Sequence, residues 1–448
     1  MHIYDFIAIG GGSAGLTAAA QVKSAGAKVA VVDHGAIGGL CSLNGCNPKK
    51  VLVRSAEVWD EVRRAADFGV ALDAERLDWS RVVDRKETLI KGVTQGSEES
   101  LATQDIDLVR GAPRFISPTR LQVNDEIYEA AGILIATGSH PRRLEFPGSE
   151  VVHTSNDLLG LRRIPQTLVT IGAGAVAFEL GQVFARAGSQ VIITTPNSQA
   201  LPMLDREIAD AVIEFSRSVG IRVLTNARVR AVQRTDNQST IELDVEGKAT
   251  VINSDYVLNA AGRPASVDGL DLPRGNVQAD KRGIIVTEFL RSPSNSHVFA
   301  AGDAHGRLQL SPIASYEGRI AGRNFLEGDV ERVNYDSVPR AVFTIPPVAM
   351  VGLTEAEARK RGLNVTAVVR DMAEWKVYGI AGEVKAKAKV ILEYGSGRIV
   401  GAHVFGAGAA EMIHVFAMAI RFGIPADELK RMVYVYPTFS SVLPYLLA

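Results

Sequence analysis

"YDFIAIGGGSAGLTAAAQVKSAGAKVAVVDHG", from Tyr4 to Gly35, decides the fold of the first part of this chain. An apolar run ends at Ile9, a glycine turn follows, and small residues predict a helix from Ala14 to Ala25. A second apolar run then ends at Asp33. This order of strand, glycine turn, helix, strand and acid indicates a unit that binds a dinucleotide.

Each part of this unit has a physical role. The G-x-G-x-x-G glycines allow a tight turn, the close approach of a pyrophosphate and close helix–strand packing. The helix N-terminus would face the phosphates, and Asp33, 18 positions after Gly15, is placed to accept a hydrogen bond from a ribose hydroxyl. The predicted contacts of the turn are Gly10, Gly12, Ser13, Ala14 and Gly15.

A second unit of the same kind begins at "QTLVTIGAGAVAFELGQVFARAGSQVIITTPN", residues 166–197. Gly172 and Gly174 repeat the turn, with Ala177 as the third small residue. The following strand ends in Thr-Thr-Pro-Asn, with no acid for a 2'-hydroxyl and no arginine for a 2'-phosphate. The choice between NADH and NADPH therefore stays open, although the hydrogen-bonding side chains there favour NADPH slightly. Two such units in tandem indicate a flavin and a nicotinamide.

The overall composition narrows the class of protein. A chain of 448 residues predicts two to four domains. The formal net charge of -1 argues against a nucleic-acid binder, and no apolar run approaches the roughly 18 residues of a spanning helix. The N-terminus lacks the pattern of a signal peptide, so we expect a cytoplasmic protein. In a reducing compartment, a close cysteine pair is typical of catalysis or metal binding.

The only two cysteines lie in "GGLCSLNGCNPKK", from Gly38 to Lys50. On a regular helix, residues five apart have Cα atoms roughly 8 to 9 Å apart, whereas a disulfide needs less than about 7 Å. If Cys41 and Cys46 are bridged, the chain between them is not regular helix, and Gly45 permits the distortion. Pro48 indicates a helix start or a kink. The alternative is two buried thiols without a redox role.

With these stretches in order, the chain resembles the pyridine nucleotide-disulfide oxidoreductases, which include glutathione reductase, dihydrolipoyl dehydrogenase and mercuric reductase. Further matching motifs are "IATGSHPR", "IGAGAVAFELG", "AAGRP", "FAAGDA", "TIPPVAMVGLTEAEA" and "YPTFSS". The resemblance implies an α/β fold with two Rossmann-like domains and a C-terminal α+β dimerisation domain. The implied FAD domain is residues 1–142 and 263–333, the NAD(P) domain 143–262, and the dimerisation domain 334–448.

The resemblance also assigns roles to residues. Cys46 would lie against the flavin as the charge-transfer thiolate, and Cys41 would be the thiol that attacks substrate. Lys50 matches the family lysine near flavin N5, and Glu179 matches its carboxylate partner. The adjacent Lys49 and Lys50 would also favour thiolates. The other implied cofactor contacts are Gly39, Ala112, Thr137, Gly138, Gly172, Gly174, Ala175, Gly262, Arg263, Gly302, Asp303 and Ala314; Arg263 would close the nicotinamide domain. We predict no metal site.

The C-terminal motif departs from the family. Disulfide reductases of this group end in His-Pro-Thr-x-x-Glu, whereas Tyr436 and Ser441 stand at those two positions here. A positioned acid–base group contributes about 10² to 10⁴ in rate, and a phenol, which ionises near pH 10, is a poor base at pH 7. Tyr436 is either an altered catalytic group or a packing residue. Two smaller departures are Ala175 for a usual aromatic residue and Lys49 for a usual serine.

Three functions follow. The first is an FAD-dependent NAD(P)H oxidoreductase that acts on a small disulfide or dithiol, as a homodimer whose C-terminal domain completes the partner's active site. The second is a mercuric reductase-like reductase of metal ions or quinones, although this chain lacks a third cysteine. The third is a flavoprotein subunit that binds a lipoyl-type protein. Elsewhere, "GEVKAKAKVILEYGSGRIVGAHVFG" predicts two strands joined at residues 395–397, with Lys385, Lys387 and Lys389 on a solvated face.

Overall fold

The computed structural model describes residues 1–72, 76–236 and 238–448. They form two compact units. The first unit contains Met1–Lys49, Asp84–Arg142 and Gly262–Val333, and the second contains Lys50–Val83, Arg143–Ala261 and Asn334–Ala448. The three-domain division expected from the sequence groups these segments differently and stays a prediction.

The first unit is built on a seven-stranded sheet. Its strand order is β3-β2-β1-β6-β5-β4, with β14 also paired to β6. The pairs β3–β2, β2–β1, β1–β6 and β6–β14 are parallel, whereas β4 and β5 extend the sheet as an antiparallel hairpin. The strands are β1 (His2–Ile9), β2 (Val29–Asp33), β3 (Asp107–Arg110), β4 (Pro113–Ser117), β5 (Arg120–Val123), β6 (Glu126–Ile135) and β14 (Val298–Ala300).

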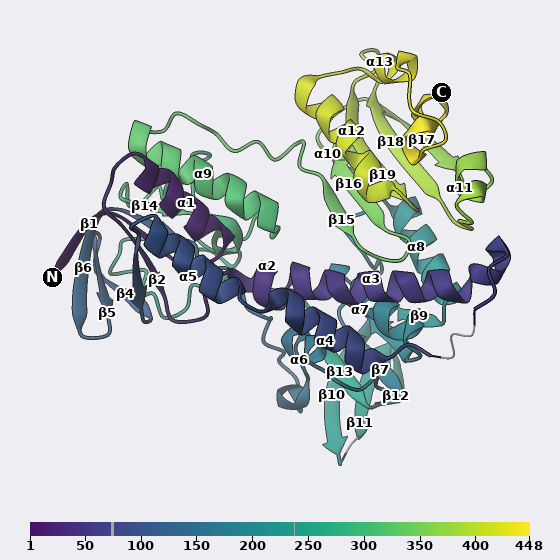
Figure 1. Cartoon of the computed structure of the whole chain (residues 1–448), viewed down its shortest axis with the longest axis horizontal. Helices are drawn as coiled ribbons and strands as arrows, with labels where there is room; N and C mark the ends of the chain where they lie inside the picture. The colour runs from purple at the N-terminus through teal and green to yellow at the C-terminus, as the bar shows by residue number, and fades with distance from the viewer. Residues whose placement is uncertain (73–75, 237) are drawn as a thin grey trace. The chain divides into compact units, whose positions relative to one another are not determined.

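Helices α1 (Ser13–Ser24) and α9 (Ser311–Glu327) lie side by side in this unit (Figure 1). Small residues allow the close approach, because a Cβ on Gly318 would lie 2.4 Å from the Ala14 carbonyl oxygen. Phe6, Val31 and Phe299, from three strands, are buried in the core beneath these helices. The remaining helices that lie in or enter this unit are α2 (Gly39–Asn44), α3 (Cys46–Arg63), α4 (Trp79–Ile90), α5 (Val93–Thr103) and η3 (Gly302–His305).

The second unit contains another parallel sheet, with strand order β13-β7-β8-β9, and a separate antiparallel sheet β10-β11-β12. The buried face of α7 packs against β7 and β8. The strands are β7 (Thr167–Ile171), β8 (Gln190–Thr194), β9 (Ile221–Leu224), β10 (Ala227–Thr235), β11 (Gln238–Val245), β12 (Lys248–Ser254) and β13 (Tyr256–Asn259). The helices are η1 (Ala65–Phe68), η2 (Ser149–Val151), α6 (Ser155–Leu159), α7 (Ala175–Arg186) and α8 (Arg206–Ser218).

The C-terminal part of the second unit is a five-stranded sheet of order β15-β16-β19-β18-β17, against which α12 packs (Figure 1). Its pairings are all antiparallel. The strands are β15 (Arg340–Val342), β16 (Val348–Gly352), β17 (Val365–Asp371), β18 (Lys387–Glu393) and β19 (Ile399–Phe405). The helices are α10 (Glu355–Lys360), α11 (Lys376–Ile380), α12 (Ala409–Phe422), α13 (Ala426–Arg431), η4 (Phe439–Val442) and α14 (Leu443–Leu446). A sheet with a parallel core, a second sheet that is parallel throughout and this antiparallel sheet confirm the predicted fold class.

One prediction about this sheet is wrong. Lys385 is exposed as expected, but Lys389 is only 2% exposed. Its ammonium lies 2.9 Å from Asp205 Oδ1 and 2.7 Å from Glu355 Oε2, and it also pairs with Glu207. Three carboxylates therefore compensate a buried charge that the alternating pattern alone placed in solvent.

Candidate functional site

The first glycine turn lies where parallel strands end together. Gly10 follows β1 with φ +113°, and a Cβ there would lie 2.3 Å from the Ala136 carbonyl oxygen at the end of β6. A Cβ on Gly15 would lie 1.9 Å from the Gly10 carbonyl oxygen. Because β1 is flanked by β2 and β6, this turn sits at the point of the sheet where the strand order reverses, which is the usual place for a dinucleotide.

The Asp33 carboxylate is fixed beside this turn. It accepts hydrogen bonds from the Gly11 N–H at 2.6 Å and from the Gly35 N–H at 2.7 Å. Gly111 N–H donates to the Asp33 carbonyl oxygen at 3.1 Å, which brings the next residue, Ala112, to the end of β2. These contacts hold Asp33 and Ala112 at the edge where the resemblance places an adenosine.

The segment before the cysteines packs on the same turn. Gly38 N–H donates to the Gly11 carbonyl oxygen at 2.9 Å. A Cβ on Gly39, which has φ +71°, would lie 2.7 Å from Gly12 Cα. The backbones of Gly12 and Gly39 are therefore in direct contact, and a side chain at residue 39 would not fit.

The ends of β6 and β14 bring the remaining predicted flavin contacts to this edge. Thr137 and Gly138 follow β6, and Gly302 and Asp303 follow β14. Ser139 Oγ donates to Asp303 Oδ2 at 2.6 Å, while burial raises the pKa of the Asp303 carboxyl. Thr137 Oγ1 is buried and has no hydrogen-bond partner among the residues that the structure describes. An unsatisfied buried hydroxyl at this edge fits a polar ligand such as FAD.

Other predicted residues surround this edge. Ser13 Oγ lies 3.0 Å from Ser311 Oγ, and a Cβ on Gly302 would lie 3.4 Å from Ala14 and 3.1 Å from Ala314. Arg263 donates to Ser139 Oγ at 3.1 Å and to the Ser139 carbonyl oxygen at 2.6 Å. The sequence did not single out Ser139, although the "TGSHPR" stretch contains it.

The cysteine segment is two helices separated by Gly45. Cys41 lies in α2, and Cys46 is the first residue of α3. Gly45 has φ -133° and ψ -111°, and a Cβ there would lie 2.7 Å from the Leu40 carbonyl oxygen. Pro48 lies in the first turn of α3, where proline is tolerated. The helix is interrupted at Gly45, as a bridged pair would require, and Cys41 is half-buried while Cys46 is exposed.

Lys50 and Glu179 are in contact, as the resemblance implied. Lys50 lies one helical turn after Cys46 in α3. Its Nζ donates to Glu179 Oε2 at 2.7 Å, and Glu179, from α7, is 2% exposed. Glu179 Oε1 accepts the Phe343 N–H at 2.9 Å. The sequence did not single out Phe343, because its partners lie more than 150 residues away.

The second glycine turn repeats the first. Gly172 has φ +112°, and a Cβ there would lie 2.1 Å from the Ala260 carbonyl oxygen at the end of β13. Gly174 precedes α7, and Ala175 begins it. Gly262, another predicted cofactor contact, has φ +100° and belongs to the first unit.

The C-terminal motif is at the surface of its unit. Tyr436 is 65% exposed, and Ser441 Oγ donates locally to the Thr438 carbonyl oxygen at 2.6 Å. Val433 and Val435 beside it are 97% and 77% exposed. An exposed phenol among exposed valines is not a packing residue of this chain's own core.

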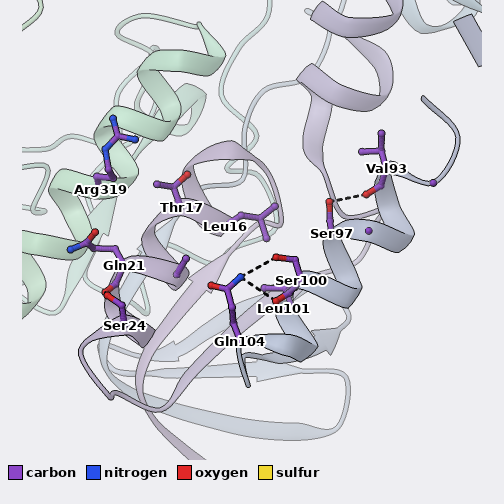
Figure 2. A pocket seen from close by; sticks show the side chains of 13 residues that line it. Leu16, Thr17, Gln21, Ser24, Val93, Ser97, Ser100, Leu101, Gln104 and Arg319 are labelled. Atoms are coloured by element: carbon purple, nitrogen blue, oxygen red, sulfur yellow. Dashed lines mark hydrogen bonds between the residues drawn. The ribbon is translucent and has the colours of Figure 1, made fainter. Parts of the chain in front are cut away.

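A separate cavity of about 670 Å³ lies in the first unit between α1, α5 and α9 (Figure 2). Leu16, Gln21, Ser97, Ser100 and Arg319 are among its lining residues. It shares no residue with the predicted site. Its polar groups are partly paired with each other, since Gln104 donates to Ser100 and Ser97 donates to the Val93 carbonyl oxygen.

Comparison with known proteins decides the family. Residues 4–318 match the model of the pyridine nucleotide-disulphide oxidoreductases, and residues 338–446 match the dimerisation domain of the same family. The chain belongs to this family. It is an FAD-dependent NAD(P)H oxidoreductase, and its C-terminal part is the family's dimerisation domain. None of the helices in the described ranges combines the length and apolar character that a membrane crossing needs.

Individual relatives match nearly the whole chain. This chain is 34% identical to a dihydrolipoyl dehydrogenase of Bacillus subtilis over 454 residues, and the match covers 97% of this chain and 96% of the relative. It is 30% identical to a mercuric reductase of Staphylococcus aureus over 443 residues, covering 98% and 81%. The Cu(II) complex of the HOCl-induced flavoprotein disulfide reductase RclA from Escherichia coli matches with a TM-score of 0.89 at 27% identity, covering 100% and 99%.

Proposed function

We propose that this enzyme passes electrons between NAD(P)H and a small disulfide or dithiol through Cys41 and Cys46. The observation that carries the proposal is the arrangement of these residues, which are the chain's only cysteines and lie on either side of a helix break at Gly45. The family supports the nicotinamide and flavin half of the reaction. The substrate is the part that we infer.

The cysteines would act by thiol–disulfide exchange. Cys41 loses its proton, its thiolate attacks one sulfur of the substrate disulfide, and a mixed disulfide forms as the first substrate thiolate leaves and takes up that proton. Cys46 then loses its proton and attacks the Cys41 sulfur, and the second substrate thiolate leaves and takes up this proton as the Cys41–Cys46 bond forms. The substrate gains two electrons, which the cysteine pair loses. Bound FAD supplies the two-electron relay from NAD(P)H that returns the pair to thiols.

The remaining predicted residues would hold the cofactors. Gly10 to Gly15, Asp33, Gly39, Ala112, Thr137, Gly138 and Asp303 would bind FAD along the strand ends. Gly172, Gly174 and Ala175 would hold the nicotinamide dinucleotide, and Lys50, paired with Glu179, would lie near the flavin. We retain the three predicted domains as part of this proposal.

We also propose a homodimer in which the C-terminal domain completes the partner's site. Exposed apolar side chains in this domain support it: Met418, Phe422, Val433 and Val435 are 52%, 74%, 97% and 77% exposed. A dimer of this kind would cover Tyr436 and bring it to the substrate.

The test is turnover of a panel of disulfides, including lipoamide and glutathione disulfide, by the wild type, Cys41→Ser and Cys46→Ser. The proposal predicts that either substitution lowers disulfide reduction by more than about 10³-fold, as loss of a nucleophile does. Flavin reduction by NAD(P)H should stay within about threefold of the wild type. Unchanged turnover of every disulfide in Cys41→Ser would show that the proposal is wrong.

Metal-ion reduction is the second candidate. Tyr436 in place of the usual histidine favours it, and it is supported by the mercuric reductase and the Cu(II)-complexed RclA among the relatives. Thiolates are good ligands for soft metal ions. Rapid NAD(P)H-dependent reduction of Hg(II) or Cu(II), with no turnover of any disulfide in the panel, would favour this candidate over the first.

A further inference from the structure

Phe343 contacts both members of the Lys50–Glu179 pair. Its backbone N–H donates to Glu179 Oε1 at 2.9 Å, and Lys50 Nζ lies 4.1 Å from the centre of its ring. Glu179 Oε2 accepts from Lys50 Nζ at 2.7 Å. The three groups therefore form a closed triangle, in which one residue binds the carboxylate through its backbone and the ammonium through its ring.

From this geometry we propose that Phe343 is a positioning residue, whose ring fixes the Lys50 ammonium for hydride transfer from NAD(P)H. The proposal rests on the role of the Lys50–Glu179 pair in the site proposed above. A cation over an aromatic ring at this distance is attracted by the negative face of the ring. Glu179 and the ring both contact the same ammonium, so together they lower the rotamer freedom of a long side chain.

The loop that carries Phe343 is itself fixed to α7. Arg186, which is 5% exposed, donates to the Ile345 carbonyl oxygen at 2.7 Å. Its Nε also donates to Asp60 Oδ1 of α3 at 3.0 Å. The same loop is thus bound by Glu179 at Phe343 and by Arg186 two residues later. Because α7 supplies both contacts, the backbone at Phe343 cannot move away from α7 without breaking these hydrogen bonds.

Helices α3 and α7 are also joined by two ion pairs, and the helix that supplies the cation differs between the two pairs. At one level α3 supplies the cation, Lys50, and α7 the anion, Glu179; at the other α3 supplies the anion, Asp60, and α7 the cation, Arg186. This arrangement fixes the register of α3 against α7. The ring of Phe343 then defines the direction in which the Lys50 ammonium points.

The direct test is amine labelling of the FAD-loaded enzyme with acetic anhydride, followed by mass spectrometry of each lysine. We compare the wild type with Phe343→Leu, which keeps the N–H and most of the apolar volume but removes the ring, and with Phe343→Tyr, which keeps the ring. We expect Lys50 to be labelled about fivefold faster in Phe343→Leu, the effect of losing about 1 kcal/mol of cation–π attraction. Phe343→Tyr should stay within about twofold of the wild type.

Lys385 provides the internal control, since its partner is Glu214 and it lies outside the site. A role in folding alone would raise labelling at Lys50 and Lys385 together, and this outcome would overturn the proposal. So would equal labelling of Lys50 in the wild type and Phe343→Leu. Phe343→Met gives the same comparison if the leucine variant does not fold.

A second measurement connects the ring to the reaction. Stopped-flow reduction of the flavin by NAD(P)H should slow about fivefold in Phe343→Leu, with an unchanged dissociation constant for the nucleotide. No disulfide enters this half-reaction, so its result is independent of the role proposed for Cys41 and Cys46. A slower disulfide step with normal flavin reduction would contradict the proposal.

Discussion

The cysteine segment and the C-terminal segment around Tyr436 differ in how much of the family's chemistry they keep. Between Gly38 and Lys50, the cysteine spacing, the glycines and the lysine that contacts Glu179 are all present. Between Tyr436 and Ser441, the proton-transfer pair of the disulfide reductases is replaced at both positions. The comparison separates the residues that we propose for electron transfer, which match the family motif, from the position that the family uses for proton transfer, which differs here.

The largest effect on disulfide turnover should come from a side chain at Gly45, the residue between the two helices of the cysteine segment. A Cβ at Gly45 would lie 2.7 Å from the Leu40 carbonyl oxygen and 3.2 Å from Cys41 Cα, so Gly45→Ala must shift the cysteines. We expect disulfide turnover to fall about 10²-fold, since a displacement of about 1 Å costs that much. Gly96→Ala is the matched control, because nothing lies within 4 Å of a Cβ there. Steady-state kinetics of both variants measures this difference. Equal disulfide turnover in the two variants would mean that the reaction does not need the helix break at Gly45.

The next largest effect is the pH dependence of stability that His403 gives to the domain that carries Tyr436. His403 is fully buried; its Nδ1 accepts the Asp205 N–H at 3.3 Å, and its Nε2 lies 3.3 Å from the Leu353 carbonyl oxygen. Burial lowers the pKa of His403 to about 4, with Asp205, Glu357 and Arg340 as charged neighbours. The unfolded chain takes up this proton below about pH 6.5, and the folded chain only near pH 4, so stability falls as pH decreases between them.

For His403 alone, the free energy of unfolding should fall by about 2 kcal/mol between pH 8 and pH 5. In His403→Gln this part of the pH dependence should disappear, which the urea midpoint at both pH values will show. Equal slopes in the two proteins would contradict it. The measurement also separates the effect of pH on folding from its effect on turnover.

Tyr436→Phe tests the C-terminal segment directly. If the phenol donates a hydrogen bond to the substrate or a sulfur, turnover of disulfides should fall about fivefold, the cost of one hydrogen bond. Flavin reduction by NAD(P)H should not change. A loss of about 10² or more would instead indicate an acid–base role, and no loss would leave the segment with no part in the reaction.

The smallest effect should come from Lys49→Ser, which restores the usual family residue. Lys49 is half-buried and contributes a positive charge next to Lys50, and dissolved salt screens part of its effect. We expect the alkylation rate of the reduced cysteines by iodoacetamide at pH 7 to fall about twofold. An unchanged rate would show that Lys49 does not compensate for the missing histidine.

The sequence predicted those features that depend on neighbours along the chain. The strand, glycine turn and helix at residues 4–35 follow from local periodicity and from the conformational freedom of Gly10, and the break at Gly45 follows from disulfide geometry. Lys389 and Phe343 could not be predicted. Their partners are Asp205 and Glu355 in one case and Glu179 and Lys50 in the other, which only the tertiary structure brings together.

The central claim is that Cys41 and Cys46 form a redox pair that stores two electrons in addition to those of the flavin. Anaerobic titration with dithionite, followed by the flavin absorbance, measures this capacity. We predict about two equivalents for full reduction of the wild type, with long-wavelength charge-transfer absorbance after the first, and about one equivalent for Cys46→Ser without that band. Full reduction of the wild type by one equivalent would contradict the claim.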